Sequence, residues 1–521
     1  MPTISKTDYI LYRECKKNVW LKIHRPDIYN KSELSEFEKT IIETGNEVEL
    51  LARKLFPEGV LIEGRKKIDQ EKTAELLAEK APVIFQPIFV KDGFLAAADI
   101  LEYNPNANGY NLYEVKATSK VEEHHYYDLA FQVNLLRKFD LNPVRNSSPT
   151  GPSGAQSAGM ISNGVKINKI SVIHLNPKYV RQGELDLKGL FVIEDVTEEV
   201  EKIVDEVSAE MDAALKYLSS EKEPAGHCDC INQSRNNHCT TFSYSNPDVP
   251  EYSVHDIARI GSSKKKLQQL IEMNIFHIHE IPEEIEFTEI QKNQIQAHVL
   301  DKVLMEKELI AKELGDLSFP LYFLDYETCP AAVPRFDGYS PYNQIPFQYS
   351  LHKLNSPADK EPEHFEFLHT KADDPSRALA ESLQKNIGDK GTVIVWNKKF
   401  ESQRNNEIGK RLPEFKSFMD SVNARIYDLM DIFSKQYYVH KDFKGSTSIK
   451  YVLPVLAPEL TYKNLNIREG GTASQSWDKI ALGSLPQKEK DQIAKDLLAY
   501  CERDTYAMYA IWRELYKMLE M

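Results

Sequence analysis

The chain is poor in cysteine, has no long apolar run and carries no excess of positive charge. No apolar stretch approaches the roughly 18 residues that a membrane span needs, so no membrane segment is expected. The net charge of -14 argues against a broadly basic surface that binds nucleic acid everywhere, although acidic residues gathered at metal sites contribute to the same total. Only six cysteines occur in 521 residues, and three of them fall within CDCINQSRNNHC, residues 228–239.

The N-terminal stretch MPTISKTDYILYRECKK also lacks the apolar core of a signal peptide. We therefore expect a cytoplasmic protein, in a reducing compartment where structural disulfides are rare. In such a compartment, clustered cysteines indicate a bound metal.

The length exceeds the size at which single hydrophobic cores stop growing, which predicts two domains and a small module between them. Strand and helix signals alternate in both halves, so both domains are expected to be α/β. We expect a first domain over residues 1–245, a helical module over 250–312 and a second domain over 318–521. Residues 142–164 are rich in Asn, Pro, Gly, Ser and Thr, which indicates a disordered insertion. No internal repeat is visible.

The stretch AAADILEYNPNANGYNLYEVKATS carries the chemistry of the first domain. Asp99 closes an apolar strand, and Glu114 and Lys116 lie on the next strand beyond a turn. Side chains alternate along a strand, so Glu114 and Lys116 share a face, and hairpin pairing can bring Asp99 close to both. Two carboxylates that hold a divalent ion beside a lysine favour phosphodiester hydrolysis. Taken alone, the pattern also fits a surface hairpin.

The hairpin and the following helical DLAFQVNLLRK together resemble the PD-(D/E)XK nucleases of the RecB-like branch. This resemblance implies a restriction-endonuclease-like fold, Mg²⁺ or Mn²⁺ held by Asp99 and Glu114, and catalytic roles for Lys116 and Gln132. The branch often has an early Gly-x3-His, and the nearest match pairs Gly45 with Glu49, so Glu49 is a candidate third metal ligand.

Many members of that branch hold an iron-sulfur cluster with one cysteine ahead of the nuclease core and three behind it. The resemblance implies a [4Fe–4S] cluster here, and zinc, which also accepts four cysteines, is the alternative. The trailing spacing is C-x-C-x8-C instead of the more usual C-x2-C and C-x5-C, and His227 and His238 are close enough in sequence to substitute as ligands. The four expected ligands are Cys15, Cys228, Cys230 and Cys239.

The module between the domains contains SVHDIARIGSSKKKLQQLIEMNIFHIHEIP, which predicts a short helix, a tight turn at Ile260–Gly261 and a longer helix. It resembles a helix-hairpin-helix, a motif that contacts phosphates without reading bases. The family's second glycine is Ser263 here, and a plain helical linker with a solvated lysine run remains the alternative. The candidate nucleic-acid contacts are Gly261, Lys264, Lys265 and Lys266.

Acidic residues recur in three contexts of the last 200 residues. LYFLDYET is an apolar strand that carries Asp325 and Glu327 on one face, a costly placement unless cations are there. Glu401 opens a helix after the strand-like TVIVW. Near the end, Tyr500 and Asp504 are one helical turn apart and therefore share a face.

This order resembles the DEDD exonucleases of the RNase H-like fold, in the variant that ends in tyrosine. The resemblance implies two Mg²⁺ or Mn²⁺ ions on Asp325, Glu327, Glu401 and Asp504, with Tyr500 orienting the attacking water. The third acid is normally Asp in an N-x2-[FY]-D pattern, whereas Asn397, Phe400 and Glu401 stand here. The longer carboxylate moves its ligand atom by about a methylene, which can preserve, slow or abolish catalysis.

Both halves together resemble an uncharacterised prokaryotic family that fuses a RecB-like nuclease to a DEDD exonuclease-like domain. The resemblance implies a metal-dependent nuclease that acts on nucleic acid, with DNA bearing a single-stranded end as the expected partner. The alternative is a nucleic-acid-binding or scaffold protein in which one or both sites have decayed. The preference between DNA and RNA, the polarity of the first domain, any protein partners and a role in repair or in defence stay open.

Overall fold

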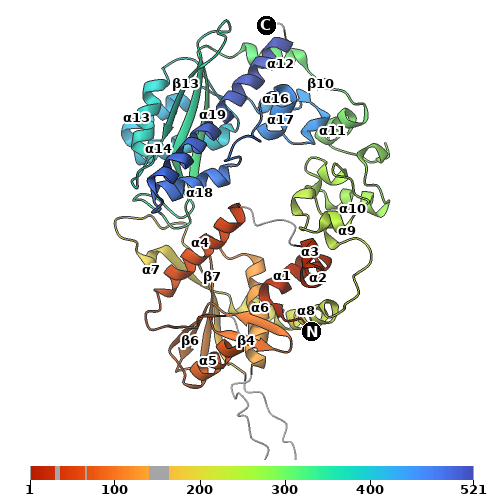
Figure 1. Ribbon diagram of the computed structural model, residues 1–521, viewed down its shortest axis with the longest axis vertical. Coiled ribbons are helices and arrows are strands. Elements are labelled where there is room, and N and C mark those ends of the chain that lie inside the picture. Colours follow the sequence, from red (N-terminus) through yellow and green to blue (C-terminus); the bar gives the residue numbers. More distant parts are fainter. Residues whose placement is uncertain (1, 30–35, 65–66, 140–163, 520–521) are drawn as a thin grey trace, which may run out of the picture. The chain divides into compact units, whose positions relative to one another are not determined.

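The computed structural model describes residues 2–29, 36–64, 67–139 and 164–519 (Figure 1). Both of its compact units combine helices with sheets of mixed strand direction, so the expected α/β class is confirmed. Most of the expected insertion at 142–164 lies outside the described residues. Unit 1 comprises Met1–Ile231, His238–Asn246 and Ala332–Pro341, and unit 2 comprises Asn232–Asn237, Pro247–Ala331 and Tyr342–Met521.

Unit 1 is built on a six-stranded sheet. β6 and β7 form an antiparallel hairpin, and β8 lies parallel to β7. Helices α6 (Glu123–Lys138) and α8 (Thr197–Leu218) pack against each other and against β8. In order across the sheet, the strands are β2 (Val60–Leu61), β3 (Val83–Phe85), β6 (Ile100–Asn104), β7 (Gly109–Lys116), β8 (Ile167–Leu175) and β9 (Phe191–Asp195).

PVIFQPIFV (82–90) and GFLAAADILEY (93–103), whose apolar residues predict one strand each, are both broken in the structure. Gln86 has a left-handed backbone (φ 54°), and Pro87 lacks the N–H that a strand ladder needs. The chain therefore leaves the large sheet after β3 and continues as β4 (Ile88–Lys91) in a second sheet with β5 (Phe94–Ala97) and β1 (Ile4–Ser5). The second stretch, GFLAAADILEY, breaks between β5 and β6, and Asp99 lies in that break.

The other helices of unit 1 are short, except α4 and α5. A capping box between Ser5 and Asp8 starts α1, and Cys15 lies at the junction of α1 and α2. Their bounds are α1 (Lys6–Glu14), α2 (Lys16–His24), α3 (Pro26–Tyr29), α4 (Glu36–Arg53), α5 (Lys67–Ala78), α7 (Leu187–Leu190) and α9 (Phe242–Ser245).

Unit 2 begins with a helical segment that has its own apolar cluster, which includes Ile257, Leu267 and Phe287. The short helix expected before the tight turn is only a 3₁₀ turn, η3 (Val254–Asp256), and a second one, η4 (Ile260–Ser262), holds the turn itself. The longer helices are α10 (Lys264–Glu272), α11 (Glu289–Val299) and α12 (Lys307–Gly315).

The rest of unit 2 surrounds a five-stranded sheet. β11 pairs antiparallel with β12 on one side and parallel with β14 on the other. The long helix α19 (Gln487–Met518) packs on β11 and β12 and crosses the sheet in Figure 1. Across the sheet, the strands are β13 (Glu363–Leu368), β12 (Gln344–Leu354), β11 (Leu321–Pro330), β14 (Thr392–Val395) and β15 (Ile426–Asp428).

The other elements of unit 2 connect these strands or pack beside them. They are α13 (Ser376–Asn386), α14 (Lys398–Arg411), α15 (Lys416–Asn423), α16 (Asp431–Ser434), α17 (Ile449–Leu456), α18 (Gly470–Ala481) and the small ladder of β10 (Leu304–Met305) with β16 (Tyr438–Val439).

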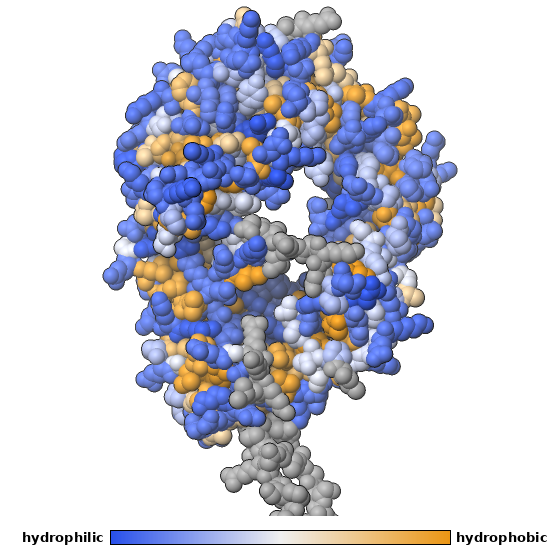
Figure 2. Space-filling model, viewed as in Figure 1, coloured by the Kyte–Doolittle hydropathy of each residue, from blue (hydrophilic) through white to orange (hydrophobic). Residues whose placement is uncertain are grey.

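The visible surface is mostly hydrophilic, with hydrophobic residues in scattered patches (Figure 2). Within the described ranges, no helix combines the length and apolar character that crossing a bilayer requires.

The sheet of unit 1 offers a matched pair of isoleucines for measuring core packing. Ile173 on β8 is fully buried, whereas its cross-strand partner Ile193 on β9 is 48% exposed. Ile173→Ala removes packed methylenes and should lower the free energy of unfolding of unit 1 by about 2–5 kcal/mol, against less than about 0.5 kcal/mol for Ile193→Ala. Urea unfolding followed by circular dichroism measures both; equal losses would contradict the burial of Ile173.

Candidate active sites and a candidate metal centre

The first candidate site lies where β6, β7 and α6 meet in unit 1. Glu114 on β7 is buried, and the backbone N–H of the next residue, Val115, donates to Asp99 Oδ2 at 2.7 Å. Burial and the negative charge of Glu114 raise the pKa of Asp99 to about 7. The Gln86 amide donates to Asp99 Oδ1 at 3.2 Å and to Glu49 Oε1 at 2.5 Å, which brings Glu49 to the same group of acids.

Two lysines compensate the negative charge of Glu114. Its Oε1 lies 2.6 Å from Lys6 Nζ and 3.0 Å from Lys116 Nζ, and Lys116 also pairs with Asp128 at 2.5 Å. Burial alone would raise the pKa of Glu114, but the charges of Lys116 and Lys6 outweigh it and hold that pKa low. Gln132 Nε2 donates to Glu114 Oε2 at 2.7 Å.

The candidate metal centre of unit 1 consists of four cysteines. One sulfur from each lies within 4.8 Å of the other three, and none of the four forms a disulfide. Cys15 Sγ and Cys239 Sγ are 3.7 Å apart, and Cys228 Sγ and Cys239 Sγ are 3.9 Å apart. Among the described residues, this group includes neither His227 nor His238. The group, Cys15, Cys228, Cys230 and Cys239, could therefore bind a metal with sulfur ligands alone.

The protein around these cysteines holds both ends of unit 1 together. The backbone N–H of Lys16 donates to Asp229 Oδ2 at 2.8 Å, and the Asn246 amide donates to Cys228 Sγ at 3.2 Å. The sulfurs of Cys15, Cys228 and Cys230 are almost fully buried with their residues. Hydrogen bonds to thiolate sulfur and exclusion of water are both features that stabilise metal–thiolate sites.

The third site is a cavity of about 220 Å³ in unit 2. It is lined by acids from three elements that are far apart in the sequence. β11 supplies Asp325 and Glu327, α14 supplies Glu401, and α19 supplies Asp504 and Tyr500. All five of the residues that the sequence predicts for this site therefore line one cavity.

Burial governs the electrostatics of this cavity. It raises the pKa of Asp325, Glu327 and Glu401 well above the usual range, and the charges of neighbouring carboxylates add to the effect. Burial also raises the pKa of Asp504, to about 6. Glu401 Oε2 is buried and has no hydrogen-bond partner among the described residues, so the site contains an unsatisfied acceptor. A cation in the cavity would relieve both the repulsion and the missing partner.

Glu401, which stands where the pattern usually has aspartate, leaves the start of α14 intact. Asn397 accepts a hydrogen bond from the backbone N–H of Phe400 at 3.2 Å and thereby caps α14, so that Glu401 lies in the first turn. Asn397, Phe400 and Glu401 all line the cavity. The nearby Asp428 is used differently, because it accepts hydrogen bonds from the backbone N–H groups of Lys398 and Met430.

A larger pocket, of about 680 Å³, adjoins the tight turn in the helical segment of unit 2. Gly261, Arg235, Arg259 and Lys444 are among its lining residues. Arg259 takes a left-handed conformation (φ 57°) directly before η4. The lysines of the run 264–266 begin α10 and do not line this pocket; Lys266 Nζ lies instead 5.2 Å from the ring centre of Phe287.

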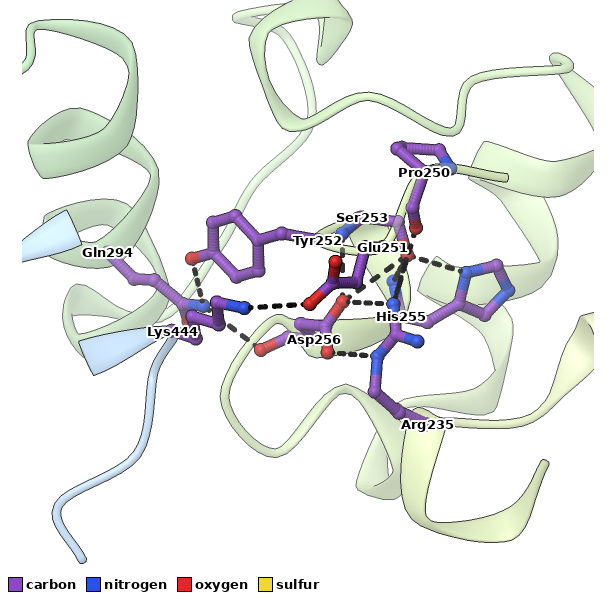
Figure 3. A network of polar contacts seen from close by, with 9 residues as sticks. All are labelled: Arg235, Pro250, Glu251, Tyr252, Ser253, His255, Asp256, Gln294 and Lys444. Carbon is purple, nitrogen blue, oxygen red and sulfur yellow. Dashed lines mark hydrogen bonds and ion pairs between the residues drawn. The ribbon is translucent and has the colours of Figure 1, made fainter. Parts of the chain in front are cut away.

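A polar network holds the walls of this pocket in place (Figure 3). Asp256 accepts from Arg235 Nη2 at 2.7 Å and from the backbone N–H of Ser253 at 2.8 Å. Gln294 Nε2 donates to the backbone carbonyl of Asp256 at 3.0 Å, and Lys444 pairs with Glu251 at 3.4 Å. The positive charges here thus come from segments that sequence spacing does not connect.

Several residues at these sites are not among those that the sequence predicts. Asp128 could have been found, because it precedes Gln132 by one helical turn on α6. Lys6 is far from the hairpin in sequence. In unit 2, Tyr462 donates to Asp504 at 2.6 Å and Lys450 lines the cavity, yet both lie in the connection between β15 and α19.

The chain is thus a mixed α/β protein with a four-cysteine group and two clusters of carboxylates. Residues 322–448 match the profile of a family described as "Domain of unknown function (DUF2779)". The uncharacterised protein MG366 of Mycoplasma genitalium is 28% identical over 210 residues, which cover 36% of this chain and 31% of the relative. The uncharacterised protein UU173 of Ureaplasma parvum serovar 3 is 24% identical over 229 residues, 38% of this chain and 31% of the relative.

The chain therefore spans under a third of the length of these curated relatives. The matches confirm, for part of the chain, the resemblance to an uncharacterised family. The fusion of two nuclease domains stays a prediction. The matched range contains Asp325, Glu327 and Glu401 and ends before Tyr500 and Asp504.

Cys15→Ser tests the metal centre against Cys329→Ser, a change at another buried cysteine that lies outside the group. Losing one of four ligands should remove most of the bound metal and lower the melting temperature of unit 1, because the ligands join the start of the unit to residues 228–239. Cys329→Ser should keep the wild-type metal content. Metal analysis of protein purified without oxygen provides the measurement, and equal metal content in both variants would contradict the site.

Proposed function

We propose that this chain is a metal-dependent nuclease that hydrolyses phosphodiester bonds of DNA, with one site in each unit. The observation that carries the proposal is the convergence of four carboxylates and Tyr500 on the 220 Å³ cavity of unit 2. The fold of unit 2 is compatible with it, since a central strand with antiparallel neighbours on one side and parallel ones on the other suits an RNase H-like domain.

The residues of this cavity fit a pair of divalent cations. Mg²⁺ and Mn²⁺ prefer oxygen ligands, and the cavity offers carboxylates that repel one another as long as no cation is present. The unsatisfied Glu401 Oε2 is a ligand atom with no competing hydrogen bond. When bound, such ions activate water and offset the charge of the leaving oxygen.

The chain's own residues then have separate tasks. Asp325, Glu327, Glu401 and Asp504 would hold the ions, and the hydroxyl of Tyr462 fixes Asp504 through its hydrogen bond. Tyr500, whose pKa is raised by burial and by the charge of Asp504, keeps its proton and can orient a water molecule. Lys450 at the cavity wall supplies positive charge for a phosphate.

Unit 1 supports a second site of the PD-(D/E)XK kind. Asp99 and Glu114 would be metal ligands, with Glu49 as the third, and Lys116 would face the phosphate. Lys116 remains protonated, since the charges of Glu114 and Asp128 outweigh burial and raise its pKa. Lys6 contacts the same carboxylate oxygen as Lys116, so a metal at Glu114 requires Lys6 to withdraw from it.

Two arguments favour different metals at the cysteine centre. The resemblance to the RecB-like branch favours a [4Fe–4S] cluster, and four clustered cysteines, three of them buried, with an amide donor to sulfur fit it. The separations of 3.7 and 3.9 Å favour zinc, because metal–sulfur bonds of about 2.3 Å in a tetrahedron separate the sulfurs by about 3.8 Å. Iron with acid-labile sulfide identifies the first, and zinc without sulfide identifies the second.

We also propose that the 680 Å³ pocket of unit 2 binds the phosphate backbone. Arg259 provides a cation at its wall, Arg235 and Lys444 line it as ion pairs with Asp256 and Glu251, and the turn at Gly261 brings backbone close to its interior. Contacts of this kind supply affinity that does not depend on base sequence. Lys264, Lys265 and Lys266 would extend the positive surface beyond the pocket.

The site of unit 1 is tested by Lys116→Ala in a protein whose second site is disabled by Asp325→Asn. Cleavage of labelled DNA with Mg²⁺ or Mn²⁺ should fall by more than about 100-fold, because Lys116 faces the reacting phosphate without holding the metal. Lys120→Ala, which removes a lysine from the exposed segment after β7, is the control and should retain activity. Equal cleavage in both variants would exclude Lys116 from catalysis.

The site of unit 2 is tested with Lys116→Ala as the background. Asp325→Asn should abolish 3′-to-5′ removal of nucleotides, because it weakens an ion ligand, whereas Tyr500→Phe should cost roughly 10- to 100-fold by disturbing only orientation. Asp420→Asn, at an exposed acid paired with Lys416, should leave the rate unchanged. If the Lys116→Ala protein digests neither DNA nor RNA, unit 2 is a binding or scaffold module instead.

A further inference from the structure

Two histidines form a stacked pair on the sheet of unit 2. His352 on β12 lies directly opposite His364 on β13 in the strand register, so both side chains project from the same face. Their rings stack with centres 4.5 Å apart and planes 22° apart. His352 is buried at 3% exposure, and α19 packs on β12 and β13.

Hydroxyl groups contact one nitrogen of each ring. Thr505 Oγ1 lies 2.8 Å from His352 Nδ1, and Ser350 Oγ lies 3.0 Å from His364 Nε2. The two hydroxyl oxygens are 2.7 Å apart, and Thr505 Oγ1 also reaches the backbone carbonyl of Glu502 at 3.1 Å.

When Thr505 donates its proton to the backbone carbonyl of Glu502, only one arrangement of the other protons satisfies these contacts. Thr505 Oγ1 then accepts from His352 Nδ1–H and from the Ser350 hydroxyl. Since the Ser350 proton is used, its oxygen accepts from His364 Nε2–H. The lone pairs therefore remain on His352 Nε2 and His364 Nδ1. Metal-binding histidines are held in this way, with one ring nitrogen donating to the protein and the other on the ion.

An acidic side chain completes the group. Glu502 on α19 places Oε1 4.0 Å from His364 Nδ1, too far for a hydrogen bond. One ligand atom from each of His352, His364 and Glu502 lies within 4.8 Å of the other two. Glu502 is about half exposed and can move toward the rings.

We propose that His352, His364 and Glu502 bind a divalent transition-metal ion of the zinc class, with water at the open position. Two imidazoles and one carboxylate form a donor set that zinc accepts and Mg²⁺ avoids. The site is therefore distinct in chemistry from the all-carboxylate cavity, and its existence does not depend on the proposed nuclease activity. Such an ion would tie β12 and β13 to α19, the helix that also carries Tyr500 and Asp504.

The test measures binding of Zn²⁺ itself by the full-length protein, with excess Mg²⁺ present to occupy the oxygen sites. The site variants are His364→Asn and Glu502→Gln, both at partly exposed positions, so that folding is not at risk as it would be with His352. The controls are His279→Asn and Glu361→Gln, exposed residues of unit 2 outside the group. Any zinc held by the four cysteines is common to all five proteins.

We expect the wild type and both controls to bind one equivalent of Zn²⁺ more than either site variant. Zn²⁺ should also raise the melting temperature of the wild type and the controls and leave that of the site variants unchanged, because an ion that binds only the folded state stabilises it. The same zinc stoichiometry in the wild type and both site variants would overturn the proposal. A nuclease-inactive protein that still shows the extra equivalent would reject the proposed function alone.

Discussion

The repulsion between buried carboxylates is the constraint on which the unit 2 cavity depends. Three elements each bring an acid to the same cavity, and burial raises the pKa of all of them. Among the described residues, these acids form no ion pair with lysine or arginine, and the main local compensation is the hydrogen bond from Tyr462 to Asp504. A packed protein keeps such an arrangement only where a cation or a proton can balance it.

In unit 1 the negative charge of a buried carboxylate is compensated in a different way. Glu114 is compensated within the protein by Lys6 and Lys116, so its pKa falls instead of rising. Asp99 forms no ion pair with lysine or arginine in the part of the chain that the structure describes, and burial raises its pKa. The position of Asp99 follows from the break at Gln86 and Pro87, because that break moves the chain from one sheet to another and leaves Asp99 between them. A local backbone feature thus determines where the acid lies.

Helix α19 links the two groups of potential ligands in unit 2. Tyr500 and Asp504 on this helix line the carboxylate cavity. Thr505, on the same helix, contacts the hydroxyl of Ser350 and the ring of His352. These residues lie within two turns of one helix. An ion that fixes Glu502 to the sheet would therefore also restrict the movement of the helix that carries Asp504.

The sequence alone determined those features that depend on local periodicity. Alternation along a strand put Glu114 beside Lys116 and Asp325 beside Glu327 on one face, and the helical turn put Tyr500 beside Asp504. The α/β class follows from the same periodicities. The strand breaks at Gln86 and Asp99 were missed because the apolar pattern continues through them, although Pro87 was a signal for the first.

Only the tertiary structure decided which faces meet. The contacts of Lys6 with Glu114, of Tyr462 with Asp504 and of His352 with His364 and Glu502 join residues from separate elements. Strand pairing and helix packing create these contacts, and periodicity within one segment carries no information about its distant partner. The cysteine group was found from sequence only through a resemblance, since nothing in the spacing connects Cys15 with residues 228–239.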